Sequence, residues 1–156
     1  MDATLLMIHS ILRWVILILI LVAIFRSFGA GSKPFTDGHK KNGLFLMIAC
    51  DIMLLIGIFQ WVTGGVHGYG LPAIQSPEGM AGVMKDPLAR FYTVEHLLMM
   101  IIAIILVHVG YSFSKKNISD AKKHTKTTLF YILALLVMLA AIPWPFREAG
   151  MGRGWI

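Results

Sequence analysis

The sequence has little charge and almost no cysteine, and both shortages narrow the class of protein. Only 14% of its 156 residues are charged, against roughly 25% in an average soluble domain. By contrast, 57% of the residues are hydrophobic and the mean hydropathy is +0.74. Too few charged side chains remain to cover a water-facing surface, which argues against a soluble domain and against a disordered chain. The composition favours a small integral membrane protein that forms one domain over residues 1–156.

The single cysteine, Cys50, excludes an intramolecular disulfide and a metal cluster held by several cysteines. It lies in an apolar run, where a thiol usually serves as a small packing residue. The ten methionines are typical fillers of apolar helices, so we do not interpret them as copper ligands. The sequence therefore directs the search for chemistry to histidines and charged side chains.

Four apolar segments are long enough to cross the hydrocarbon core of a bilayer, which takes about 20 helical residues. They cover residues 3–25, 43–62, 91–113 and 128–143. Because lipid offers the backbone no hydrogen-bond partner, we expect each segment to be an α-helix. The last helix should stop near Pro143, because Pro143 and Pro145 lack backbone donors. Short connections between sequential helices favour an up-down antiparallel four-helix bundle.

Positive charge is concentrated in the connections that follow the first and third spans. These connections and their flanks contain Arg26, Lys33, Lys40, Lys41, Lys115, Lys116, Lys122, Lys123 and Lys126. Cytoplasmic loops carry such an excess, so we place both connections in the cytoplasm and both termini outside. The net charge of +6 is then a topological signal, and no nucleic-acid partner is expected.

The segment between the second and third spans is rich in glycine and proline. Such a composition predicts an irregular loop. We expect this loop to fold over the outer mouth of the bundle.

Ionisable side chains inside the spans are the best candidates for function, because each costs about 2.5–3.5 kcal/mol in the membrane. They are His9, Arg13, Asp51, Glu95, His96 and His108. His9 and Arg13 share one face of the first helix, since they are one turn apart. Glu95 and His96 lie near the outer end of the third span. Alternating helix directions therefore bring these four side chains to one level of the membrane.

Histidines from two diagonal helices can ligate one iron from opposite sides in the core of a bundle, where cofactors are commonly held. His9 and His96 are therefore candidate ligands of one haem iron. The alternative is structural: His9 and His96 would hydrogen-bond neighbouring helices while Arg13 pairs with Glu95. Gly57 on the second helix would let a flat macrocycle approach the backbone. The second ring nitrogen of His96 needs an acceptor, which a backbone carbonyl or Glu95 would supply.

Other residues near the outer face receive supporting roles in this prediction. Arg13 would pair with the carboxylate of Glu95 or with a haem propionate. Arg90 and Arg147 would meet propionates at the outer surface, since guanidinium matches carboxylate geometry. His67, in the glycine-rich segment, is the alternative ligand.

The remaining histidines lie away from this level. His108 lies near the opposite membrane face, so it cannot share an iron with His96. We expect it to form a structural hydrogen bond with Asp51, with a proton relay or a contact to a quinone headgroup as alternatives. His39 and His124 lie among lysines, and we expect them to be solvated.

Three segments also carry a resemblance to a family. Residues 8–14 (IHSILRW), 94–100 (VEHLLMM) and 142–148 (IPWPFRE) resemble the small four-helix bacterial membrane proteins that are catalogued as cytochrome b-like. The resemblance extends over essentially the whole chain. It implies a role in electron transfer with haem b, with His9 and His96 as the ligand positions. Respiratory cytochromes b have two histidines on each of two helices, whereas here only the third span has two, so one haem is expected.

Three functions stay open at this level. The first is a membrane electron-transfer protein that passes electrons between quinol and an outer redox partner. The second is a haem-free subunit of a larger membrane complex, in which Arg13, Glu95, His9 and His96 form a structural polar cluster. The third is a small proton or ion carrier that uses Asp51 and His108. A homo-oligomer in the lipid bilayer is compatible with each.

Overall fold

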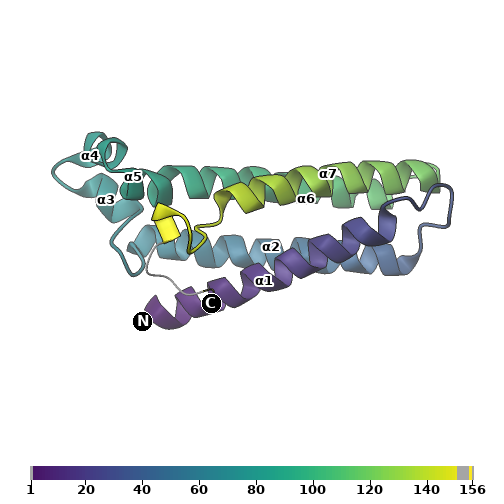
Figure 1. The fold of residues 1–156 in the computed structure, drawn as a ribbon, viewed down its shortest axis with the longest axis horizontal. Helices are drawn as coiled ribbons and strands as arrows, with labels where there is room; N and C mark the ends of the chain where they lie inside the picture. The colour runs from purple at the N-terminus through teal and green to yellow at the C-terminus, as the bar shows by residue number, and fades with distance from the viewer. Residues whose placement is uncertain (1, 151–154, 156) are drawn as a thin grey trace.

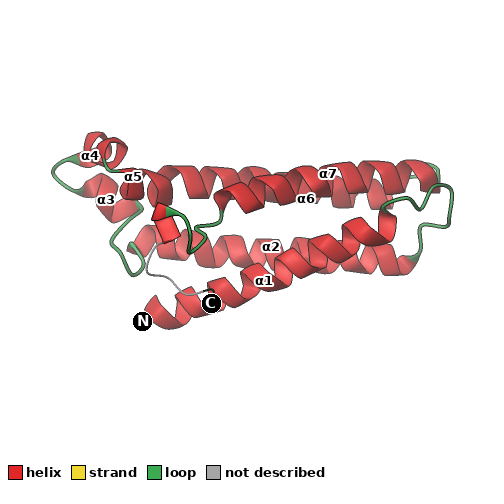
Figure 2. Cartoon of the chain, viewed as in Figure 1, coloured by secondary structure: helices red, strands yellow, loops and turns green. Residues whose placement is uncertain are grey.

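Four long helices form the body of the molecule. The computed structural model describes residues 2–150 and residue 155, and the long helices are α1 (Asp2–Ser27), α2 (Asp37–Thr63), α6 (His96–Lys115) and α7 (Asp120–Ala141) (Figure 1). Short helices α3 (Leu71–Gln75), α4 (Gly79–Lys85) and α5 (Pro87–Arg90) lie between α2 and α6. A π-helical turn, η1 (Phe91–Glu95), leads directly into α6, and a 3₁₀ turn, η2 (Glu148–Gly150), follows α7. The regular structure of the described residues is therefore helical (Figure 2).

The packing of the long helices determines which of them can share a site. Helix α1 packs on α2 and α7, and α6 packs on the same two helices. Helices α1 and α6 are therefore diagonal neighbours, as predicted for the first and third spans. The start of α1, the end of α7 and the short helices lie at one end of the bundle, whereas the α1–α2 and α6–α7 connections lie at the other (Figure 1).

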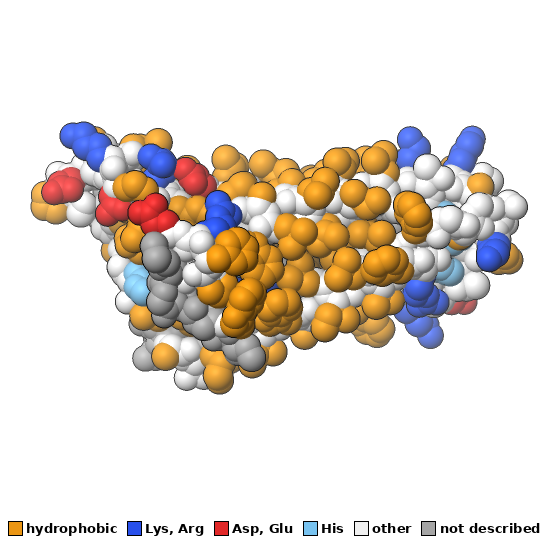
Figure 3. Space-filling model, in the orientation of Figure 1, with side chains coloured by type: hydrophobic (Ala, Val, Ile, Leu, Met, Phe, Trp, Pro, Cys, Tyr) orange, Lys and Arg blue, Asp and Glu red, His pale blue; other side chains and the backbone are white. Residues whose placement is uncertain are grey.

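The described chain has four helical segments that are long and apolar enough to cross a membrane, which confirms the expected number. They are Ala3–Ser27, Asp37–Thr63, Pro87–Lys115 and Asp120–Ala141. Hydrophobic side chains cover the middle of the visible face, and charged side chains gather toward its two ends (Figure 3). Large apolar side chains such as Phe25 and Leu55 are 75% and 69% exposed. Such a surface suits acyl chains better than water, as in a multi-pass membrane protein.

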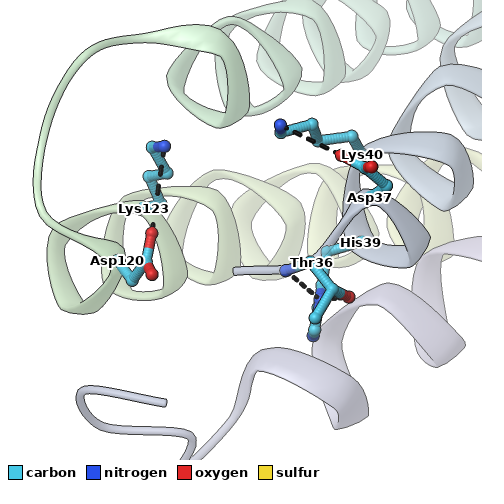
Figure 4. Close-up of polar contacts among 6 residues, drawn as sticks. All are labelled: Thr36, Asp37, His39, Lys40, Asp120 and Lys123. Atoms are coloured by element: carbon cyan, nitrogen blue, oxygen red, sulfur yellow. Dashed lines mark hydrogen bonds and ion pairs between the residues drawn. The ribbon is translucent and has the colours of Figure 1, made fainter. Parts of the chain in front are cut away.

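Two of the helices begin earlier than the hydropathy windows predicted. Helix α2 starts at Asp37 rather than near residue 43, and α7 starts at Asp120 rather than near residue 128. Hydropathy locates only the part of a helix that suits lipid, whereas local hydrogen bonds extend these helices through a polar turn. The N–H of Thr36 donates to Nδ1 of His39 at 3.2 Å, which caps α2. Lys40 pairs with Asp37 at 3.2 Å, and Lys123 pairs with Asp120 at 3.9 Å (Figure 4).

The segment between α2 and α6 is helical in part, so the prediction of an irregular loop was wrong. Its prolines start short helices instead of breaking structure, with Pro72 and Pro87 in the first turns of α3 and α5. The carboxylate of Asp86 accepts hydrogen bonds from the N–H groups of Leu88 and Ala89 at 2.8 and 3.1 Å. This N-cap satisfies donors that a four-residue helix cannot satisfy itself.

Two glycines make room for the bulkiest fully buried side chain of the described residues, Tyr131 of α7. A Cβ atom on Gly110 of α6 would lie 2.6 Å from Cε1 of Tyr131. A Cβ atom on Gly43 of α2 would lie 2.7 Å from the Tyr131 hydroxyl oxygen. Both distances are shorter than van der Waals contact. The ring therefore packs here because the two facing helices have no side chain at these positions.

Replacing Gly110 should test this packing. We expect Gly110→Ala to lower the free energy of unfolding by about 1–3 kcal/mol, because the added methyl group overlaps an enclosed ring. Thermal unfolding followed by circular dichroism in detergent measures the change. The matched control is Gly57→Ala, whose Cβ would lie at an ordinary 3.6 Å from Cε1 of His9. Equal losses in the two variants would contradict the packing argument.

Candidate functional site

His9 and His96 lie across from one another in the bundle. His9 is on α1 and His96 is the first residue of α6. Their ring centroids are 6.4 Å apart, and the ring planes are inclined by 50°. Both side chains line a cavity of about 180 Å³. The structure therefore brings the two predicted ligand residues to one level and to one cavity.

The distance between these rings is compatible with a shared metal ion. A metal–nitrogen bond of about 2.0 Å and a ring radius of about 1.2 Å place the centroids of two opposite imidazoles about 6.4 Å apart. The observed separation equals this value. It also lies within the range of about 4.5–7 Å that packed aromatic rings adopt.

A hydrogen bond to the end of α7 orients His96. Its Nδ1 lies 2.8 Å from the carbonyl oxygen of Ala141. A carbonyl only accepts, so in the neutral ring Nδ1 carries the proton and Nε2 carries the lone pair. In a continuing helix this carbonyl would accept from the residue four positions on, which is Pro145 and has no N–H. The proline therefore leaves an acceptor for His96.

The π-helical turn η1 stands immediately before His96. The N–H of His96 donates to the carbonyl of Phe91, five residues earlier. A π turn widens the helix by one residue and thereby rotates the side chains that follow, and such turns are frequent at functional sites. Sequence analysis treated residues 91–113 as one regular helix and missed this turn. Hydropathy gives no signal for it, because the turn leaves the apolar pattern intact.

One chain of hydrogen bonds holds the segment after α2 against the cavity. Trp61 Nε1 donates to the carbonyl of Thr93 at 2.8 Å, and the N–H of Gly70 donates to Thr93 Oγ1 at 2.9 Å. Gly70 has a φ of 85°, and a Cβ there would lie 2.2 Å from the Trp61 carbonyl oxygen. Only glycine fits both the conformation and the space. These contacts join α2, the following segment and η1.

This arrangement puts His67 at the same cavity as His9 and His96. Its ring lies 6.4 Å from that of Tyr92, which stacks on Tyr69 at 5.4 Å with planes 7° apart. Residues of the segment after α2 therefore line the cavity, in line with the expectation that it folds inward. Over the part of the chain that the structure describes, no group of three or more His, Cys, Asp or Glu side chains could hold a metal.

Arg13 also lines the cavity, one turn along α1 from His9. Its Nη2 donates to the carbonyl of Trp155 at 2.6 Å, and Trp14 Nε1 donates to the same oxygen at 2.9 Å. The rings of Trp14, Trp144 and Trp155 lie 6.1 to 6.5 Å from one another. These contacts join α1 to the chain that follows α7.

Glu95 has a different partner from the expected Arg13. Its Oε1 accepts from Nε of Arg90 at 2.8 Å, and the two side chains are 43% and 38% exposed. The residues are five positions apart, a spacing that a π-helical turn brings onto one side of the helix. The acceptor of His96 is likewise the Ala141 carbonyl and not the carboxylate of Glu95. Glu95 is thus a partner of Arg90 at the edge of the site.

Arg147 caps the end of α7. Its Nη1 donates to the carbonyls of Ala140 and Ile142, and its guanidinium lies 5.6 Å from the centre of the Phe91 ring. A cation is favourable here because the last carbonyls of a helix lack partners and carry partial negative charge. Its contact with a propionate stays a prediction.

The inner part of the cavity is apolar. Gly57 lines the cavity beside His9, and a Cβ there would lie 3.6 Å from Cε1 of His9. The walls farther in are formed by side chains of α2, α6 and α7, among them Cys50, Met53, Leu54, Met100, Ile104 and Met138. Roughly 10–15 Å³ is enough for one water molecule, so this cavity has room for an organic ligand.

Two other histidine predictions have opposite outcomes. The contact of His108 with Asp51 is confirmed, with Nε2 and Oδ1 3.3 Å apart. The expectation that His124 is solvated was wrong, because it is only 3% exposed. Phe35, in the α1–α2 connection, covers it, with ring centroids 4.8 Å apart, and His39 packs on it at 5.0 Å. Sequence position among lysines gave no sign of this long-range contact.

Comparisons with known proteins leave the site to be interpreted from its own geometry. No protein-family model, curated protein or solved structure matches the chain. The resemblance to cytochrome b-like proteins stays a prediction.

The Arg90–Glu95 pair allows a test of whether polar contacts at this level hold the fold together. Both side chains are partly exposed, so we expect Glu95→Gln to change the free energy of unfolding by less than about 1 kcal/mol. Thermal unfolding in detergent, with Arg90→Gln measured in parallel, checks this. A loss of several kcal/mol in either variant would show that the pair is a main support of the bundle.

Proposed function

We propose that this chain is a membrane-bound electron-transfer protein of the b-type cytochrome kind, which holds one haem between His9 and His96. The observation that carries the proposal is the 6.4 Å separation of the two rings across a cavity. The Ala141 carbonyl supports it, because a metal-binding histidine usually donates its other N–H to such an acceptor. Imidazole from two helices of a bundle is a suitable ligand pair for iron.

The types of residue around the cavity suit such a group. Haem supplies a one-electron redox centre when it is bound. The apolar walls would exclude water and raise the free energy of the more charged redox state, which tunes the potential. Arg13, on the cavity wall, and Arg147, beside the end of α7, would neutralise the propionates. His67 remains the alternative ligand on the same cavity.

The orientation in the membrane is part of the proposal. We infer an antiparallel up-down bundle in a bacterial inner membrane, with both termini and α3–α5 on the periplasmic side. The lysine-rich α1–α2 and α6–α7 connections support it, since positive loops stay in the cytoplasm. The haem would then lie near the outer face and exchange electrons between quinol in the bilayer and an outer redox partner.

Removing either ligand should remove the haem. The purified protein is expected to show a Soret band and a reduced-minus-oxidised spectrum of a b-type cytochrome, as isolated or after reconstitution with haem. His9→Ala and His96→Ala should each lose at least about tenfold in haem affinity, because coordination and its supporting hydrogen bond are lost together. Titration of the Soret absorbance measures this.

Two further variants make the test specific. His39→Gln, at the other end of the bundle, should leave the spectrum unchanged. His67→Ala should keep the low-spin spectrum if His9 and His96 are the ligands, and should lose it if His67 is one of them. A wild-type protein that stays folded and shows no Soret band after reconstitution would reject the haem proposal in favour of the haem-free subunit.

The proposed orientation has its own test. Single cysteines are introduced by Ser32→Cys in the α1–α2 connection and Ser76→Cys between α3 and α4, in a Cys50→Ala background. Both serines are exposed. A membrane-impermeant maleimide added to spheroplasts should label residue 76 and spare residue 32. The reverse pattern would invert the topology, and labelling of both would exclude the alternation of helix directions.

A further inference from the structure

The Asp51–His108 pair is placed where a membrane protein rarely has an ionisable group. Asp51 lies eight residues inside the apolar part of α2 (Asp37–Thr63), which begins near residue 43, so about 12 Å of helix separates it from that boundary. The side chains of His108 and Asp51 are 42% and 45% exposed, on the outside of the bundle where α2 meets α6. The pair therefore meets the surrounding bilayer and not the cavity. Polar groups at this depth usually mark a functional site.

Both side chains of the pair present polar groups. Nδ1 of His108 lies 2.9 Å from the carbonyl oxygen of Ile104, which can only accept, so Nδ1 carries a proton. Nε2 of His108 and Oδ1 of Asp51 lie 3.3 Å apart, within ion-pair distance. The pair therefore offers an imidazole nitrogen and a carboxyl group to a ligand.

The side chains around the pair favour a small lipid-soluble ligand over another helix. Exposed neighbours on α2 are Ile48, Ile52 and Leu55, and those on α6 are Ile102 and Ile105. Helix interfaces in membranes are rich in small residues that let backbones approach, whereas these are bulky. A ligand at this surface must arrive through the hydrocarbon. It must also carry groups that pair with a donor and an acceptor.

The pair and the cavity lie on opposite sides of α2 and α6. Cys50, next to Asp51 in the chain, lines the cavity, as does Ile104, whose carbonyl binds His108. A helix with its side chains is about 10–12 Å across. A ligand at the pair would therefore lie about one helix width from the inner wall of the cavity, and about 18 Å along α6 from His96.

We propose that Asp51 and His108 form the headgroup site for a lipid-soluble quinone or quinol on the outer surface of α2 and α6. The imidazole of His108 donates to a quinone carbonyl, and the carboxyl group of Asp51 accepts from a quinol hydroxyl. The apolar tail lies along Ile48, Ile52 and Leu55. The physiological use of this site rests on the proposed electron-transfer function, whereas binding itself does not.

Photo-cross-linking tests the site directly. The protein in lipid nanodiscs is illuminated with an azido-benzoquinone that carries a decyl tail, with unlabelled decylubiquinone as competitor, and labelled peptides are identified by mass spectrometry. Labelling should fall on α2 and α6 around Asp51 and His108. Asp51→Asn and His108→Gln should weaken it about tenfold or more, because each replaces a group that binds the headgroup. The control is Asp120→Asn, which removes the carboxylate that pairs with Lys123 at the end of the bundle. This variant should leave the labelling unchanged.

A second variant covers the case in which the polar substitutions disturb folding. Ile105→Trp adds bulk one turn before His108 on the lipid-facing surface and leaves the side chains of Asp51 and His108 unchanged. It should therefore block labelling in a normally folded protein. Labelling elsewhere, or labelling at the pair that these variants do not change, would overturn the inference. An Ile48→Cys variant tests for a dimer at this surface. If two copies form a disulfide and the linked protein is no longer labelled, the surface binds a second copy and the inference is overturned.

The experiment separates this inference from the haem proposal. Specific labelling without a Soret band would keep the quinone site and reject the haem. A Soret band without specific labelling would do the opposite. If both are present, haem reduction by decylubiquinol should be slowed in Asp51→Asn while the Soret band is unchanged.

Discussion

The hydrogen bond between His96 and the carbonyl of Ala141 is the contact on which the arrangement of the site depends. In lipid an unpaired carbonyl is costly, and α7 must leave one because Pro143 and Pro145 supply no N–H groups. The imidazole of His96 satisfies that acceptor from α6. The contact therefore anchors the end of one helix to the start of another, and it leaves the opposite edge of the ring to meet His9. Arg147 satisfies neighbouring carbonyls at the same helix end.

Polar groups in the spans are divided between two sides of the helical wall. His9, His96 and Arg13 line the cavity, where α1, α2, α6 and α7 surround them. Asp51 and His108 lie on the outside, against lipid. Arg13 binds the carbonyl of Trp155, His96 that of Ala141, and His108 that of Ile104, since unpaired polar groups are costly at low dielectric. A bundle of this kind can keep one polar site dry inside and offer another to molecules dissolved in the bilayer.

The parts of the structure that follow from hydropathy and from simple helical geometry could be predicted. The four long apolar helices, the diagonal relation of α1 and α6, the convergence of His9 with His96 and the Asp51–His108 contact all belong here. In lipid, length and apolarity dictate a helix, and helix rise then places a residue at a depth. Two side chains at one depth on facing helices have few other partners. The haem ligand roles and the orientation in the membrane are not decided by these features and remain proposals.

Other contacts were decided only when the chain folded. The π-helical turn of Phe91–Glu95, the choice of Arg90 over Arg13 as the shown partner of Glu95, and the burial of His124 beneath Phe35 have no pattern in the sequence. In each case several partners of similar chemistry are available, and the contact forms with the partner that packing brings within reach. The amino-acid order by itself determined which segments are helices and how deep their polar residues lie, because lipid leaves the backbone one solution. The tertiary structure alone decided which of those residues touch, because contact depends on helix rotation and on the turns that join the helices.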